Sequence, residues 1–313
     1  MDIRILTYFL AVAREKNISR AAKSLHITQP TLSKQLKDLE EELGVTLFTR
    51  GSREIQLTDS GRYLYSKGKE ILSLVEKTAN NLTNDAIISG EIYIGGGETK
   101  AISFISDSLH SLIKAHPDIQ FHLYSGNADD IIDKLDSGLL DFGLVIEPTN
   151  KQKYQSFRLP AQDRWGLLIH RNHPLAKQTV IHPQELKTVP LIISRQTSVD
   201  SQLAEWLGFS IDQLSIVGTY NLLYNASLMV DNGTFGALAL DGIINTYGTE
   251  KVFIPLDPPL QASLNLIWKK DQPLSPAARK FLDVIICQIK RDKTFHLRNS
   301  KKLLMVFGNL VIF

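Results

Sequence analysis

The chain has 313 residues, of which 43% are hydrophobic and 22% charged, as expected for an ordinary chain of two or three folded domains. Its formal net charge of +2 excludes a protein that binds nucleic acid through an overall basic surface. Cys287 is the one cysteine, which excludes an intramolecular disulfide and a cysteine-built zinc site. The apolar runs are too short for a membrane helix and no export signal opens the sequence, so we expect a cytoplasmic protein.

Residues 17–44 have the pattern of two short helices joined by a tight turn. Ser19 occupies a position suited to a helix N-cap, and Ala21, Ala22 and Leu25 provide the apolar face of the first helix. A two-residue His-Ile turn follows. The spacing predicts that this first helix packs behind the second one.

The second helix is predicted to begin after Thr28, a further N-cap, with Pro30 in its first turn. Leucines recur on one face at spacings of four, three and four, and the opposite face carries amides, hydroxyls and lysines. Such side chains reach base edges and phosphates when a helix lies in the major groove of DNA. The pair therefore predicts a helix-turn-helix. The alternative is a small three-helix domain whose polar face is only solvated.

A β-hairpin is predicted directly after this pair, with its turn at residues 50–53. Arg50 and Arg53 lie at the tip, where a hairpin beside a groove-docked helix contacts phosphates or the minor groove. The first sixty residues hold nine Lys/Arg against eight Asp/Glu, because an acidic run at residues 40–42 offsets the cations. We expect that run to face away from DNA.

Residues 21–50, followed by Leu-Thr-Asp-Ser-Gly at 57–61, resemble the N-terminal domain of the LysR-type transcriptional regulators. The residues that carry the resemblance, in family order and spacing, are Ala21, Ala22, Gln29, Pro30, Ser33, Leu39, Glu40, Leu43, Gly44, Leu47, Phe48, Arg50, Leu57, Thr58 and Gly61. Lys34 departs from the arginine frequent in the family, and lysine binds as a point charge instead of a fork. The pattern and the resemblance together nominate as DNA-binding residues Ser19, Arg20, Thr28, Gln29, Pro30, Thr31, Ser33, Lys34, Arg50 and Arg53.

Residues 58–89 are predicted to form one long helix whose apolar residues recur close to a heptad repeat. One interpretation is a core helix that packs inside its own domain. The other, implied by the family resemblance, is a linker helix that pairs with the same helix of a second subunit. The residues nominated for this dimerisation are Leu64, Ile71, Val75 and Leu82.

From residue 90 the pattern changes to alternating strands and helices, which is typical of a parallel, doubly wound α/β sheet. The first set is predicted as strands at 90–97, 119–124 and 142–146 with helices at 102–115 and 129–135. The second set is predicted as strands at 165–170, 191–194, 216–220, 233–240, 252–254 and 262–268 with helices at 201–208, 222–230 and 276–290. Two α/β halves joined by crossing strands form a cleft at their strand and helix ends.

The predicted fold class is thus α/β, with an N-terminal winged helix-turn-helix, a long linker helix and a two-subdomain α/β effector domain. This last part is similar to the effector domain of the LysR family, whose architecture resembles that of periplasmic solute-binding proteins. The expected domains are 1–58 for DNA binding, 59–89 for the linker helix, 90–294 for effector binding and 295–313 as an atypical tail. The effector domain is expected to divide into a first half, 90–162 plus 269–294, and a second half, 163–268.

Polar residues that follow the predicted strands are the candidate effector-binding residues, since helix N-termini at such positions favour anions. They are Gly97, Glu98, Thr99, Lys100, Ser125, Asn127, Glu147, Arg195, Gln196, Thr197 and Ser198. The family resemblance points most directly to Thr99, Lys100 and Thr197, and the alternative is that these are ordinary polar loop residues. Lys100 and Arg195 are expected on opposite walls of the cleft, which predicts a small carboxylate as effector. Glu98 and Glu147 would suit an amino-acid-like variant of that ligand.

Other site chemistry is not predicted. The three glycines at 95–97 lack the spacing of a phosphate-binding loop, and the histidine pair at 170 and 173 is typical of a solvated turn. No nucleophile and base are paired, so we expect no enzyme activity, cofactor or metal. The tail, residues 295–313, is basic and then apolar, too short to span a membrane. It could add a strand, bind a partner, or be an artefact of the sequence.

The predicted function is that of a sequence-specific DNA-binding regulator controlled by a small-molecule effector. Its expected partners are double-stranded operator DNA, the effector, a second copy of the chain as a dimer or tetramer, and RNA polymerase. The alternative is a small-molecule binding or transport protein without regulatory DNA binding. The helix-turn-helix pattern and the missing export signal argue against that alternative.

Overall fold

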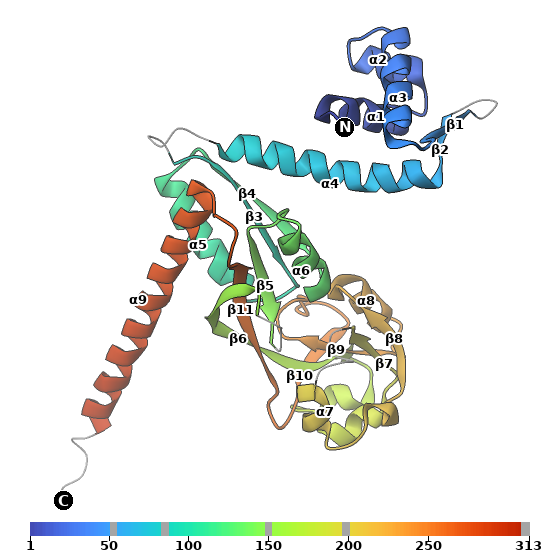
Figure 1. Ribbon diagram of the computed structural model, residues 1–313. Coiled ribbons are helices and arrows are strands. Elements are labelled where there is room, and N and C mark those ends of the chain that lie inside the picture. The colour runs from blue at the N-terminus through green and yellow to red at the C-terminus, as the bar shows by residue number, and fades with distance from the viewer. Residues whose placement is uncertain (51–54, 83–87, 148–151, 196–200, 308–313) are drawn as a thin grey trace, which may run out of the picture. The chain divides into compact units, whose positions relative to one another are not determined.

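The computed structural model describes residues 1–50, 55–82, 88–147, 152–195 and 201–307 (Figure 1). The chain forms two compact units, Met1–Asn80 and Asn81–Phe313, and each is described by itself. No helix among the described residues is long and apolar enough to cross a membrane.

The first unit is a winged helix-turn-helix. Its elements are α1 (Ile3–Glu15), α2 (Ile18–Ser24), α3 (Gln29–Leu43), β1 (Phe48–Arg50), β2 (Ile55–Leu57) and α4 (Asp59–Asn81). Its core is a cluster of side chains from α1, α2, α3 and the chain entering β1, which includes Leu6, Phe9, Val12, Leu36 and Leu47. β1 and β2 pair antiparallel as the predicted hairpin.

Two caps fix where the paired helices begin. Thr28 caps α3 as predicted, since its side chain accepts a hydrogen bond from the backbone amide of Thr31. The prediction for α2 is wrong: Asn17 is its N-cap, accepting from the amide of Arg20, and Ser19 lies inside the helix. His26 makes the turn between the helices with φ of 55°, a left-handed conformation.

The long helix α4 differs from its prediction in length and packing. It ends at Asn81 instead of Ser89, so Leu82 lies beyond it. Leu64 and Ile71 pack against the core of the first unit. Gly68 does so too, because a Cβ there would lie 2.9 Å from Leu6 Cδ1. The first turns of the apolar stripe are thus covered by the chain itself.

The second unit is built on one mixed sheet whose described strands run in the order β4-β3-β5-β11-β6-β9-β7-β8, with β10 also paired to β6 (Figure 1). Its strands are β3 (Gly90–Gly96), β4 (Ile119–Ser125), β5 (Phe142–Ile146), β6 (Tyr154–His170), β7 (Leu191–Ser194), β8 (Ile216–Tyr220), β9 (Gly236–Leu240), β10 (Lys251–Pro255) and β11 (Gln261–Lys269). Its α-helices are α5 (Ile102–Ala115), α6 (Ala128–Asp136), α7 (Ser201–Leu207), α8 (Leu223–Val230) and α9 (Pro276–Phe307). Short 3₁₀ helices occupy Pro174–Lys177, Pro183–Thr188 and Ile211–Gln213.

Strands β6 and β11 connect two α/β halves. The strands at each end pair in parallel (β3 with β4 and β5; β7 with β8 and β9), whereas β6 and β11 pair antiparallel with a register shift between Ser263 and Asn265. The start of β6 packs in the core with α5 and α9, and its end packs with α7 in a second core. β6 begins at Tyr154, eleven residues before the predicted strand, because this crossing segment is half exposed and lacks a continuous apolar run.

Helix α9 continues to Phe307 and does not stop near Lys290 as predicted. Its first half packs on α5, where the Ser108 hydroxyl donates to Gln288 Oε1. The tail was predicted to begin at 295, and the backbone is helical through residue 307, so the added-strand alternative is wrong for that segment. The exact limits of the predicted domains stay predictions.

Candidate DNA-binding surface and effector junction

Helix α3 divides its side chains between a buried and an exposed face. Leu32, Leu36 and Leu39 are buried in the core of the first unit, while Leu43 at the end of the predicted apolar row is 38% exposed. The predicted DNA-contacting residues of this helix and its cap are exposed, except Ser33, which is half-buried: Thr28, Gln29, Pro30, Thr31, Ser33 and Lys34. A rigid apolar anchor therefore carries a polar face of the type that reads base edges.

Local hydrogen bonds hold two pairs of these side chains. The Gln29 amide donates to Ser33 Oγ at 3.0 Å, one helical turn away. The hydroxyls of Thr28 and Thr31 lie 2.8 Å apart. On α2, Ser19 and Arg20 are exposed, and the Arg20 guanidinium donates to the carbonyl of Glu15 at the end of α1. These bonds preorient the side chains without burying them.

The wing is attached to α3 by the acidic run. Glu40 accepts hydrogen bonds from the amides of Leu47 and Phe48, the latter at 3.1 Å, so one of the three acids fixes the entry into β1. Arg50 is the last residue of β1 and pairs in register with Ile55. Arg53 lies outside the described residues. The direction in which the acidic run faces DNA stays a prediction.

In the second unit, the loop from β3 to α5 reaches the other half directly. Thr99 is buried, and its hydroxyl donates to Asp163 Oδ2 on β6 while accepting from the amide of Ala101. Asp163 is 5% exposed. Sequence reasoning missed this carboxylate, because it lies within the long strand β6 and is buried only where the β3–α5 loop meets that strand.

The environment of Asp163 opposes its ionisation. Burial raises the pKa of its carboxyl, and the charge of Asp241 raises it further; hydrogen bonds from Thr99 and the Lys100 amide, with the charge of Lys100, act in the other direction. Asp241 is paired with Arg164 at 3.2 Å. The Lys100 side chain lies against Gly242, where a Cβ would be 2.9 Å from Lys100 Cδ.

Glu98, next to Thr99, makes a second contact across the halves. Its Oε2 accepts a hydrogen bond from the amide of Leu223, the first residue of α8. Burial, and then the charge of Glu98, raise the pKa of the Tyr220 hydroxyl, which donates to the carbonyl of Leu238 at 2.8 Å. We call the meeting place of Glu98, Thr99 and Lys100 with Asp163, Leu223, Asp241 and Gly242 the junction.

The other candidate effector residues lie at strand ends but serve varied roles. Gly97 and Ser125 end or follow neighbouring strands, Glu147 follows β5, and Arg195 is exposed after β7. Asn127 caps α6 in a capping box with Asp130. Gln196, Thr197 and Ser198 lie outside the described residues. The structure brings Glu98, Thr99 and Lys100 to the second half through their side chains, and the amide of Glu147 donates to the carbonyl of Ser263 on β11 at 2.9 Å.

Asn265 is a further polar residue that sequence reasoning missed. It is 2% exposed, and its Nδ2 atom has no hydrogen-bond partner among the described residues. It lies opposite Val145, near the carboxyl end of β5, where ligands of α/β folds bind. A buried amide nitrogen without a partner among the described residues costs free energy.

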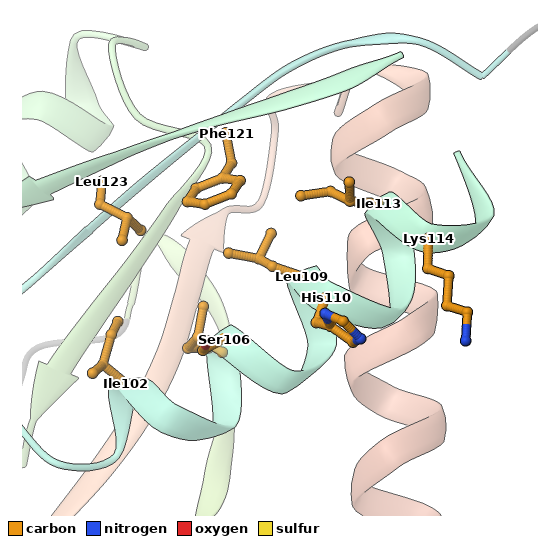
Figure 2. A pocket seen from close by; sticks show the side chains of 9 residues that line it. Ile102, Ser106, Leu109, His110, Ile113, Lys114, Phe121 and Leu123 are labelled. Carbon is orange, nitrogen blue, oxygen red and sulfur yellow. The ribbon is translucent and has the colours of Figure 1, made fainter. Parts of the chain in front are cut away.

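An apolar hollow of about 430 Å³ lies between α5 and β4, the edge strand of the first half. Figure 2 shows Ile102, Leu109 and Ile113 of α5 facing Phe121 and Leu123 of β4 across it, with His110 and Lys114 at the outer side. Phe121 is 40% exposed and Leu123 56% exposed. Exposed apolar side chains gathered in one hollow are typical of a surface that binds a partner.

The chain matches two family models. Residues 3–62 match "Bacterial regulatory helix-turn-helix protein, lysR family", and residues 87–289 match "LysR substrate binding domain". The HTH-type transcriptional regulator YwbI of Bacillus subtilis (strain 168) is 34% identical over 289 residues, which cover 90% of this chain and 95% of that protein. YbhD of Escherichia coli (strain K12), also an HTH-type transcriptional regulator, is 26% identical over 307 residues, or 93% of each chain.

Solved structures have the same fold. CbnR, a LysR family transcriptional regulator, superposes with a TM-score of 0.73 at 20% identity, covering 92% of this chain and 99% of that one. Full-length CbnR complexed with its target DNA gives a TM-score of 0.72 at 19% identity, covering 91% and 99%. These likenesses confirm the predicted fold class, and the two family models confirm the predicted family. The chain belongs to the LysR family and is a transcriptional regulator with a helix-turn-helix DNA-binding domain and an effector-binding domain.

Proposed function

We propose that the chain reads operator DNA with the exposed face of α3 and uses a small carboxylate, bound between the halves of its second unit, as its control signal. The observation that carries the first part is the division of α3 into buried leucines and an exposed row of amide, hydroxyl and ammonium groups. Gln29 is suited to bidentate bonds with adenine. Lys34, Arg20 and the wing arginines Arg50 and Arg53 supply phosphate or groove contacts.

The junction supports the second part of the proposal. Lys100 offers a cation on one side, and Arg195 follows a strand on the other half. Asp163 accepts a hydrogen bond from Thr99 and interacts with the charges of Lys100 and Asp241, and Glu98 directly precedes Thr99 in the chain. A ligand with both a carboxylate and an ammonium group uses both signs of charge, which favours the amino-acid-like variant.

We further propose that copies of the chain pair through the second unit as well as through the linker. On α4, Val75 is 39% exposed and remains available, whereas Leu64 and Ile71 are engaged in the first unit. The hollow between α5 and β4 is concave and apolar, and α8 presents Tyr224, Leu228 and Met229 at 63%, 50% and 54% exposure. A two-fold pairing that seats α8 of each copy in the hollow of the other buries both surfaces at once.

The remaining parts of the proposal concern catalysis, location in the cell and the transcription machinery. The family consists of transcriptional regulators, and we propose that this chain acts without catalysis, in the cytoplasm, together with RNA polymerase. The alternative of a pure transport or binding protein is overturned by the family assignment.

The test is a mobility shift with the DNA upstream of the chain's own gene and a scrambled duplex of equal length. Full-length protein should prefer its upstream DNA by the roughly 10³-fold or more typical of specific binders. A thermal-shift panel of small carboxylates and amino acids, run on the wild type and on Lys100→Ala, then tests the effector. Equal affinity for both duplexes would overturn the first part, and stabilisation by neutral apolar molecules alone would overturn the second.

A further inference from the structure

The root of the wing, residues 46–48, is held from two sides. On the side of α3, one carboxylate oxygen of Glu40 accepts hydrogen bonds from the amides of both Leu47 and Phe48. On the side of α4, the amide of Thr58, directly before that helix, donates to the carbonyl of Leu47 at 3.0 Å. The backbone that enters β1 is thus fixed between α3 and the start of α4.

Close packing accompanies these bonds. Leu47 is 1% exposed, and a Cβ on Gly61 of α4 would lie 2.1 Å from the carbonyl oxygen of Leu47, so α4 passes directly against the root. The second strand is held by α1, because the amide of Ile55 donates to the carbonyl of Lys16 at 3.2 Å. Backbone bonds therefore connect β2 to α1, whereas a side chain, that of Glu40, connects β1 to α3.

Glu40 has a neighbour of equal charge with a different partner. Glu41 is exposed on the same helix and pairs with Lys37 at 3.3 Å. Glu40 is half-buried and makes two charge-assisted hydrogen bonds to backbone amides. An acid in a DNA-binding unit ordinarily weakens binding, because it repels phosphates. Substitution of these two adjacent acids can therefore separate the effect of charge from the effect of position.

We propose that Glu40 is a positioning residue for DNA binding, whose carboxylate fixes β1, and with it Arg50, relative to the exposed face of α3. This rests on the proposed function, in which that face and the wing arginines contact DNA together. Arg50 lies two residues beyond Phe48, whose amide Glu40 binds. A root that is free to move must be ordered when DNA binds, so loosening it weakens the complex without changing a group that contacts DNA.

The first test compares Glu40→Ala and Glu40→Gln with the charge-matched controls Glu41→Ala and Glu41→Gln, as full-length proteins. Both Glu41 variants should bind the upstream and scrambled duplexes as tightly as the wild type or more tightly, because each removes a negative charge. Glu40→Ala should instead bind both duplexes roughly tenfold more weakly, the scale of one lost charge-assisted bond. Glu40→Gln retains a neutral acceptor and should fall between. Glu40 variants that bind like their Glu41 controls would overturn the proposal.

A double-mutant cycle with Arg50→Ala distinguishes positioning from a general loss of structure. Glu40→Ala should cost less affinity in the Arg50→Ala protein than in the wild type, since a contact that it positions is already absent. Destabilisation of the whole unit would lower the affinity by the same factor in both, and that result would contradict the proposal. Urea unfolding shows whether each variant is folded under the binding conditions. If Glu40→Ala gives no folded protein, Glu40→Gln carries the cycle.

The same measurements separate this inference from the proposed function. Wild-type protein that does not prefer its upstream duplex, or Arg50→Ala protein that binds as the wild type does, would contradict the proposed function. Weakened binding by Arg50→Ala, beside Glu40 variants that follow their Glu41 controls, would contradict only the role of Glu40.

Discussion

In the helix-turn-helix unit the polar groups proposed to act are mostly exposed, and their printed bonds reach partners three to five residues away. At the junction the bonds reach partners 64 and 125 residues away, across two halves of a domain. The first arrangement leaves side chains free to meet a macromolecule whose shape is fixed. The second connects two halves through buried polar contacts, so a ligand that enters must exchange bonds with the protein. The comparison supports the proposal that base sequence is read by residues held on one helix, and that an effector is sensed through contacts between the two halves.

The largest expected effect is a loss of stability on substitution of the buried face of α3 that does not occur on its exposed face. Leu32→Ala removes a fully buried side chain and should lower the free energy of unfolding of the first unit by about 2–5 kcal/mol. Lys34→Ala changes an exposed neighbour and should alter stability by less than about 0.5 kcal/mol while weakening DNA binding. Urea denaturation and mobility shifts of both variants measure this. Similar stability losses in the two would contradict the assignment of faces.

The next prediction concerns the pairing of second units. Leu228→Glu places a charge on the exposed face of α8 and should weaken dimerisation by about 2 kcal/mol or more if that face is buried in the dimer. Val75→Glu tests the linker in the same way. Light scattering across a dilution series measures how strongly each of the two variants dimerises. Dimers that persist unchanged in Leu228→Glu would remove α8 from the interface.

Asn265 tests whether the second unit retains polar groups at the expense of stability. Asn265→Leu replaces a buried amide, whose nitrogen has no partner among the described residues, by an apolar side chain of similar size. It should raise the free energy of unfolding by about 1–3 kcal/mol. Asn265→Asp, which buries a charge, should lower it. Thermal unfolding checks both, and a destabilised Asn265→Leu would show that the amide nitrogen is satisfied in solution.

The smallest effect is a change in the pH dependence of stability. The pKa of Asp163 is raised in the folded state, so the folded chain binds more protons than the unfolded chain above the ordinary aspartate pKa of about 3.9. The contribution of Asp163 to the free energy of unfolding therefore falls as the pH rises from about 3.9 through the raised pKa. Above the raised pKa this contribution is constant. Asp163→Asn should remove this fall. A variant whose pH profile of urea unfolding matches the wild type would contradict the burial of that charge.

Much of the fold could be predicted because the signals are local. The bounds of α5, β5, β7 and β8 coincide with their predictions, since each has an apolar pattern that one element explains. Ser19 was placed wrongly as a cap because Asn17, two residues earlier, is an equally good N-cap residue. The early end of α4 and the long β6 depend on packing that no local pattern expresses.

The candidate site divides in the same way. The DNA-binding candidates of α3 could be nominated from the helix period and the family resemblance, and the structure finds all of them exposed except Ser33, which is half-buried. Asp163 and the contact of Glu98 with Leu223 could not, because they arise only when the two halves meet. The one available signal was negative: the sequence before α8 offers Leu222 where a capping residue is expected.

The central claim is that the exposed face of α3 reads base sequence. The most direct measurement is the affinity of full-length wild type, Gln29→Ala and Lys34→Ala for the upstream duplex and a scrambled duplex over a range of salt concentrations. Gln29→Ala should lose about 1–3 kcal/mol of preference for the upstream duplex with an unchanged salt dependence. Lys34→Ala should weaken both complexes alike and reduce the salt slope by about one. A Gln29→Ala protein with unaltered preference would contradict the claim.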